Sequence, residues 1–173
     1  QPIAWKEKVL MYEPVRIFIS YSHKDELFME QLRNALIPLE RTREIAVWAD
    51  PLIEAGQDWG EEIFENLDRA DIFILLLSQA SVASEFVTEK ELPRAMETRA
   101  SRPCEIIGVV TRPCEAGLKR LRLSERQLIF YNKKAICQTN RRDTAWDHVV
   151  KELEKVIARL HKRWGKTGRR RPS

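Results

Sequence analysis

The sequence predicts an α/β fold built on a doubly wound, five-stranded parallel sheet with helices on both faces. Strand-like apolar runs alternate with helix-like stretches, which is typical of βαβ units. The run Ile72–Leu77 is apolar throughout, as expected for a parallel strand covered on each side. The run at residues 15–19 stops abruptly at polar residues 20–25, and an amphipathic helix pattern follows. Such a junction places polar groups at the carboxyl edge of a sheet, where open α/β sheets bind ligands.

Five runs have the composition of strands: residues 15–19, 45–48, Ile72–Leu77, Glu105–Val110 and 128–131. A right-handed doubly wound sheet in an order such as 2-1-3-4-5 has its topological switch between the first and third strands. The loops that follow the first three strands are therefore expected to border a ligand crevice.

Three helices are expected from apolar periodicity. The first spans residues 25–39, and the second begins near Asp58. The last begins at a cap on Asp143 or Thr144 and keeps an apolar stripe as far as Leu160. The stripe of the first helix is Phe28, Leu32, Ala35, Leu36 and Leu39.

The length of 173 residues suits one domain, which we place at residues 14–160 after an N-terminal extension at 1–13. Residues 161–173 are interpreted as a basic tail or linker. Six positively charged residues lie among the last twelve residues of the chain. Without them, the rest of the chain is close to neutral. Such a tail can contact nucleic acid or anionic lipid, or simply remain solvated.

Three cysteines, an odd number, argue against a disulfide framework and favour a reducing cytoplasm. No apolar run approaches the roughly 18 residues that span a bilayer, so no membrane association is expected. The histidines and cysteines are too scattered for a zinc site, and no glycine-rich phosphate loop is present.

The first two loops carry distinctive residues. The first offers Ser20, Tyr21, Ser22 and Asp25 ahead of a helix, an arrangement suited to a phosphate or carboxylate. Alternatively, Ser22 or Asp25 simply caps that helix. In the second loop, Leu52 and Ile53 would be exposed unless a partner subunit or a ligand packs on them.

Several motifs occur together in a specific order. They are Phe18-Ile19-Ser20-Tyr21-Ser22 with Asp25, Asp50 with Glu54-Ala55-Gly56, Leu76-Leu77-Ser78, Ser84-Glu85-Phe86, Lys90-Glu91-Leu92, Arg112-Pro113-Cys114 and Asp143-Thr144-Ala145-Trp146. With these motifs the chain resembles a TIR (Toll/interleukin-1 receptor) domain of the bacterial type over roughly residues 14–160. The resemblance implies a flavodoxin-like fold.

The resemblance also implies an activity. Many bacterial, plant and axonal members cleave NAD⁺ at the nicotinamide–ribose bond and release nicotinamide with ADP-ribose or a cyclic ADP-ribose. NAD⁺ is then a substrate, and no cofactor is required. Their essential glutamate corresponds best to Glu91, with Glu89 as the alternative because the spacing from the aromatic Phe86 is five residues instead of four.

Other site residues follow from the same resemblance. Ser20, Tyr21, Ser22, Asp50, Glu54 and Phe86 are expected to bind the substrate. Leu52, Ile53, Ala55 and Gly56 form the interaction loop that completes the site of a neighbouring copy during self-association.

The alternative within the family is a non-catalytic scaffold that binds other TIR domains. Glu54-Ala55-Gly56 resembles catalytic members, whereas receptor-type members usually carry a proline before the glycine, so the enzyme is favoured. A fused or separate sensor domain and a bacterial antiviral role are implied, and interference with a host's TIR signalling stays open.

Overall fold

Five parallel strands form one sheet in the order β2-β1-β3-β4-β5, as predicted. They belong to a computed structural model that describes residues 12–51, 65, 68–83, 97, 104–121, 123–124 and 127–167. The strands are β1 (Val15–Tyr21), β2 (Ile45–Pro51), β3 (Ile72–Leu77), β4 (Glu105–Val110) and β5 (Leu128–Ile129). β1 lies between β2 and β3 in the sheet. The chain passes from β1 to β2 on one side of β1 and then returns to form β3 on its other side, so the topological switch lies between β1 and β3, as expected.

Three strands differ in length from the prediction. β1 ends at Tyr21 instead of residue 19, so Ser20 and Tyr21 belong to the strand and not to the loop that follows it. β2 reaches Pro51 instead of Trp48, because it pairs with β1 from Val15–Ile45 through Tyr21–Pro51. β5 is only two residues long and pairs with β4 at Gly108 and Val109. Tyr131 lies outside the sheet and forms an isolated antiparallel bridge with Lys134.

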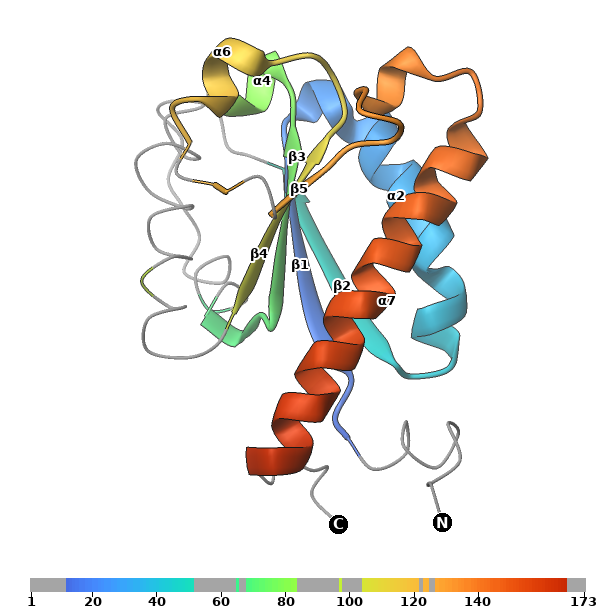
Figure 1. Cartoon of the computed structure of the whole chain (residues 1–173). Coiled ribbons are helices and arrows are strands. Elements are labelled where there is room, and N and C mark those ends of the chain that lie inside the picture. The colour runs from blue at the N-terminus through green and yellow to red at the C-terminus, as the bar shows by residue number, and fades with distance from the viewer. Residues whose placement is uncertain are drawn as a thin grey trace.

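The helices α2 (Glu26–Arg41) and α7 (Arg142–Thr167) cover one face of the sheet (Figure 1). Their apolar side chains pack on alternate residues of β1, including Ile17 and Ile19, in one buried cluster. Phe18 faces the other way and joins a second cluster with Phe73 and Leu77. The short helices α4 (Gln79–Val82) and α6 (Glu115–Leu118) add Val82 and Leu118 to that second cluster. The sheet therefore has a buried core on each face.

α2 begins one residue later than predicted, because His23–Asp25 form a separate 3₁₀ turn, η1. The predicted apolar stripe is confirmed: Phe28, Leu32 and Leu36 are buried, and Ala35 and Leu39 pack against the same cluster. The helix expected near Asp58 lies outside the described residues.

α7 begins at Arg142, so Asp143 lies in its first turn and neither Asp143 nor Thr144 is the cap. The helix continues to Thr167, and the boundary predicted at residue 160 cuts through it. Trp164 is only 5% exposed, and the Tyr12 ring stacks on His161 with centroids 5.2 Å apart. Residues 161–167 therefore belong to the folded body and not to a tail. None of the described helices is long and apolar enough to cross a membrane.

Candidate functional site

A pocket of about 740 Å³ lies at the carboxyl edge of the sheet. The segments after β1, β3 and β4 meet there, together with the 3₁₀ turn η4 (Ile136–Gln138). The lining residues are Lys24, Asp25, Ser78, Gln79, Ala80, Ala83, Arg112, Pro113 and Cys137. The pocket thus opens beside the switch between β1 and β3, where open α/β sheets place their ligands. Figure 1 shows this end of the sheet at the top, beneath α4 and α6.

Asp25 connects the three segments. Its carboxylate is fully buried and accepts a hydrogen bond from the Ser78 hydroxyl on Oδ2. Arg112 Nε donates to Oδ1 at 3.0 Å, which makes an ion pair between a buried carboxylate and a half-exposed guanidinium. Both carboxylate oxygens therefore have partners, as a buried charge requires. The pair joins the end of β1 to the start of α4 and to the loop after β4.

Two polar residues before α2, Ser22 and Asp25, make different contacts. Ser22 caps η1, since its Oγ accepts a hydrogen bond from the Lys24 N–H at 3.3 Å. Asp25 precedes α2 but makes no side-chain cap bond to it. Its side chain is used for the contacts with Ser78 and Arg112 instead.

Ser78 is itself part of a local structure at the end of β3. It is the N-cap of α4, where its Oγ accepts from the Ser81 N–H at 3.2 Å. The Ser81 Oγ accepts in return from the Ser78 N–H at 2.9 Å, which completes a capping box. The direction in which the chain leaves β3 is therefore fixed by the same hydroxyl that contacts Asp25.

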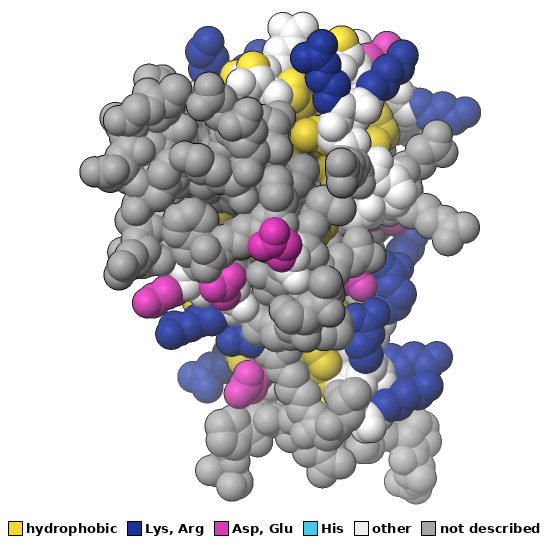
Figure 2. All heavy atoms as spheres, turned by 90° about the vertical axis from the view of Figure 1, so that its left-hand side faces the viewer, with side chains coloured by type: hydrophobic (Ala, Val, Ile, Leu, Met, Phe, Trp, Pro, Cys, Tyr) yellow, Lys and Arg dark blue, Asp and Glu magenta, His cyan; other side chains and the backbone are white. Residues whose placement is uncertain are grey.

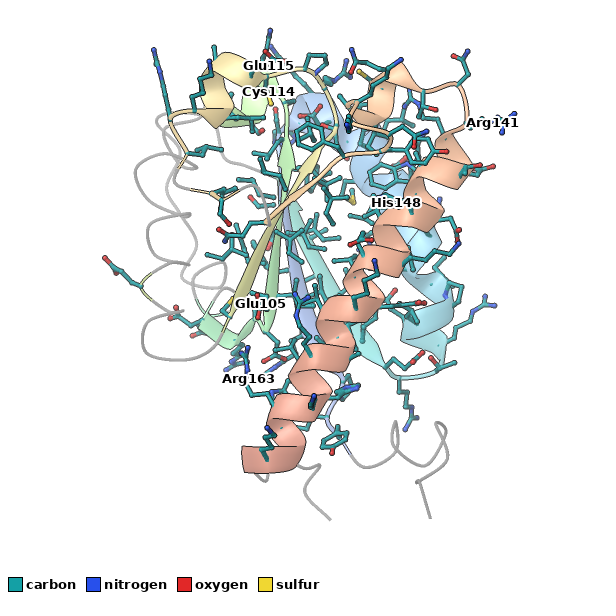
Figure 3. The ribbon with its side chains drawn as sticks, in the orientation of Figure 1. Glu105, Cys114, Glu115, Arg141, His148 and Arg163 are labelled. Carbon is teal, nitrogen blue, oxygen red and sulfur yellow. The ribbon has the colours of Figure 1, made fainter. Side chains whose placement is uncertain are left out.

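Phe28, on the first turn of α2, lies between two arginines. The guanidinium of Arg112 is 5.0 Å from the centroid of its ring, and that of Arg142 is 5.1 Å away. Arg142 donates from Nε to the Thr139 carbonyl and from Nη2 to the Cys137 carbonyl. Figure 3 shows Cys114 and Arg141 at this same carboxyl end, whereas the Arg163–Glu105 ion pair lies at the opposite end.

Ser20 and Asp50, two of the predicted substrate-binding residues, are paired in register between β1 and β2. Their side chains share one face of the sheet, because partners in a parallel register point the same way. Tyr21 is the next residue along β1 and points to the opposite face, into the cluster beneath α2 and α7. The structure therefore brings Ser20 and Asp50 together and separates Tyr21 from them by the sheet. None of the three lines the pocket.

Burial raises the pKa of the Tyr21 hydroxyl above its usual value, and the Glu26 and Asp50 carboxylates raise it further. The hydroxyl is thus protonated at neutral pH and can donate a hydrogen bond. Burial and, to a lesser degree, the Asp25 carboxylate raise the pKa of the Cys114 thiol to about 11. This free thiol is therefore not a nucleophile at neutral pH.

The remaining predicted site residues lie outside the described part of the chain. They are Leu52, Ile53, Glu54, Ala55, Gly56, Phe86, Glu89 and Glu91. Among the described residues, no group of three His, Cys, Asp or Glu side chains is arranged to hold a metal ion.

Arg112 was recognised only as part of a motif, without a role, and the contact of Ser78 with Asp25 was not predicted. Ser78 directly follows the last residue of β3, and Arg112 comes two residues after the end of β4. Applying the carboxyl-edge rule to the fourth strand as well as the first three would have identified Arg112.

Comparisons with known proteins agree with this architecture. The family model of the TIR domain matches residues 17–155. The uncharacterized protein y4lF of Sinorhizobium fredii (strain NBRC 101917 / NGR234) is 36% identical over 99 residues, which are 57% of this chain. The chain spans only about a third (31%) of the length of that relative.

Two solved structures align with parts of the chain. The crystal structure of the RPS4 and RRS1 TIR domain heterodimer aligns with a TM-score of 0.54 and 12% identity, over 80% of this chain and 95% of that one. The TIR domains of the activated Roq1 resistosome recognizing the effector XopQ align with a TM-score of 0.43 and 20% identity, over 55% and 56% of the two chains. The match to the family model covers most of the folded body, and on that ground the chain belongs to the TIR domain family.

Proposed function

We propose that this TIR domain is an NAD⁺ glycohydrolase that acts at the carboxyl-edge pocket. One observation carries the proposal. Gln79 and Ala83 line the pocket, and they immediately precede in sequence the segment that carries Phe86, Glu89 and Glu91. That segment resembles the one with the essential glutamate in catalytic members of the family.

The reaction suits a site with one reactive carboxylate. The bond between ribose C1′ and the pyridinium nitrogen breaks, and its electron pair neutralises the positive nicotinamide ring, so no general acid is needed. Positive charge develops on the ribose as an oxocarbenium-like centre. Water then adds at C1′ and loses a proton to give ADP-ribose, or the adenine ring attacks C1′ to give a cyclic product.

Glu91 is proposed to stabilise this positive charge or to orient a ribose hydroxyl, and Phe86 to stack on the leaving nicotinamide. The interaction loop at residues 52–56 of a neighbouring copy completes the site, so activity is expected to rise with self-association. The described residues on the pocket wall supply the fixed scaffold for these groups, through the Asp25 contacts with Ser78 and Arg112.

The test is nicotinamide release from NAD⁺ by concentrated protein, measured by chromatography. Glu91→Gln keeps the shape of the side chain and removes its charge, and we expect it to slow release by roughly 100-fold or more. Glu89→Gln is the matched control and should leave the rate within about twofold of native.

Other results would assign the site or the function differently. If only Glu89→Gln slows nicotinamide release, the catalytic residue is Glu89. If neither variant slows it, the catalytic residue does not lie in this segment. If the native chain releases no nicotinamide under crowding, the chain is a scaffold for other TIR domains, as in the heterodimer of RPS4 and RRS1 TIR domains.

A further inference from the structure

The Arg112 guanidinium contacts Asp25 and Phe28, and the rest of it is accessible. Nε is bound to the buried Asp25, and the face of the guanidinium lies over Phe28. Half of the side chain is nevertheless exposed, and the residue lines the pocket. Among the described residues no acceptor bonds to its Nη1 or Nη2. A guanidinium pre-oriented through Nε keeps these N–H groups for a bidentate contact with an oxyanion.

Lys24 supplies a second positive charge to the same pocket. It is exposed, and it lies next to Asp25 in η1. Asp25 is the only carboxylate among the described lining residues, and both of its oxygens are already bonded inside the protein. The accessible charges of the described lining are therefore all positive. Figure 2 shows Lys and Arg side chains around hydrophobic ones at the carboxyl end of the molecule, with acidic atoms beside them.

The size of the pocket limits the class of ligand. A volume of about 740 Å³ exceeds what one inorganic anion fills and lies within the usual range for nucleotide-sized ligands. Asp50 is not part of the described lining. The phosphates of such a ligand are therefore best placed at the two cations.

We propose that Arg112 and Lys24 form a subsite for the diphosphate of a nucleotide. This inference rests on the proposed function, because it assigns the diphosphate of NAD⁺ to these two residues and not to the loop after β2. Asp25 and Phe28 are positioning residues that hold the Arg112 guanidinium at the pocket wall.

Arg142 provides a matched control. Its guanidinium contacts the same Phe28 ring at nearly the same distance as that of Arg112. Its N–H groups donate to the Thr139 and Cys137 carbonyls, and the residue is not part of the pocket lining. Arg142→Gln therefore removes a cation–ring contact and the hydrogen bonds to the Thr139 and Cys137 carbonyls, but no side chain that lines the pocket.

The experiment is calorimetric titration of the full chain with ADP and, separately, with adenosine. Native protein is expected to bind ADP more tightly than adenosine, and the difference should shrink as salt is raised. Arg112→Gln and Lys24→Gln should each weaken ADP binding by roughly 10- to 100-fold and leave adenosine binding unchanged. Arg142→Gln should bind both ligands like the native chain.

Equal affinity of the native chain for ADP and adenosine overturns the subsite, and so does an equal loss in Arg142→Gln and Arg112→Gln. If Arg112→Gln fails to fold, the test rests on Lys24→Gln, because Lys24 is exposed. Unchanged ADP binding in that variant refutes the proposal. ADP binding requires no cleavage. A chain that binds ADP through Arg112 but releases no nicotinamide contradicts the glycohydrolase function and leaves the subsite intact.

Discussion

At the scale of single residues, Asp25 shows how far local sequence reasoning reaches. Its place between a strand and a helix was recognised from the sequence, and both an anion-binding role and a capping role were left open. The actual partners, Ser78 and Arg112, are 53 and 87 residues away in the chain. No local pattern encodes a contact of that separation, so only the topology reveals that the three segments meet.

A stability measurement distinguishes a capping role of Asp25 from its contacts with Ser78 and Arg112. Asp25→Ala leaves the Ser78 hydroxyl without its acceptor inside a buried site, and we expect a loss of about 1–3 kcal/mol in the free energy of unfolding. Ser22→Ala removes only the cap of η1 and should cost about 1 kcal/mol or less. Urea denaturation of the two variants checks this. Equal losses would show that the Asp25 contacts add nothing beyond a cap.

At the scale of elements, the type of each strand or helix was predicted better than its length. β3 and β4 match their predicted ranges, because continuous apolar runs bounded by polar residues mark a buried parallel strand. β1 and β2 are longer and β5 is shorter than predicted, because pairing with a neighbour decides where a strand ends. The end of α7 was missed for a related reason: Trp164 follows two cationic residues, and its burial depends on contact with the N-terminal side of the chain.

The last turns of α7 are therefore expected to contribute to stability. Trp164→Ala removes a large side chain that is 5% exposed, and we expect a loss of about 3–5 kcal/mol in the free energy of unfolding. Lys162→Ala, at an exposed position in the same turn, is the control and should change stability by about 0.5 kcal/mol or less. A small effect of Trp164→Ala in thermal or urea unfolding would restore the interpretation of residues 161–167 as a tail.

At the scale of the whole molecule, the described ends of the chain meet far from the pocket. Tyr12 packs on His161 and Trp164 at the amino edge of the sheet, whereas the pocket lies at the carboxyl edge (Figure 1). Burial lowers the pKa of His161 below its usual value of 6.5, an effect that Glu44 partly offsets. The folded state therefore favours the neutral imidazole.

The sign of the pH effect follows from this shift. The unfolded chain binds a proton at His161 more readily than the folded chain does, so stability is lost as the pH falls below about 6.5. His161→Gln cannot take up the proton, so the native chain should lose stability relative to this variant between pH 7.5 and 5. Urea midpoints across this range test the prediction. A stability difference that does not change with pH would mean that His161 titrates alike in both states.

The fold as a whole was predictable from the alternation of strands and helices, and the sheet order is confirmed. The site was predictable only in part. The crevice between β1 and β3 was inferred from the topological switch, and the pocket is there. The lining residues Lys24 and Arg112 were not predicted, and Ser20 and Tyr21, which point to opposite faces of the sheet, are not among the described lining residues. Local sequence shows that residues follow a strand, but not which segments converge.

The most direct test of the central claim is the rate of nicotinamide release from NAD⁺ per molecule of protein, measured over increasing protein concentration. The native chain is predicted to release nicotinamide at a rate per molecule that rises with concentration, because a neighbouring copy is proposed to complete the site. Glu91→Gln provides the background rate. A native rate equal to that background at every concentration would contradict the assignment of this TIR domain as an NAD⁺ glycohydrolase.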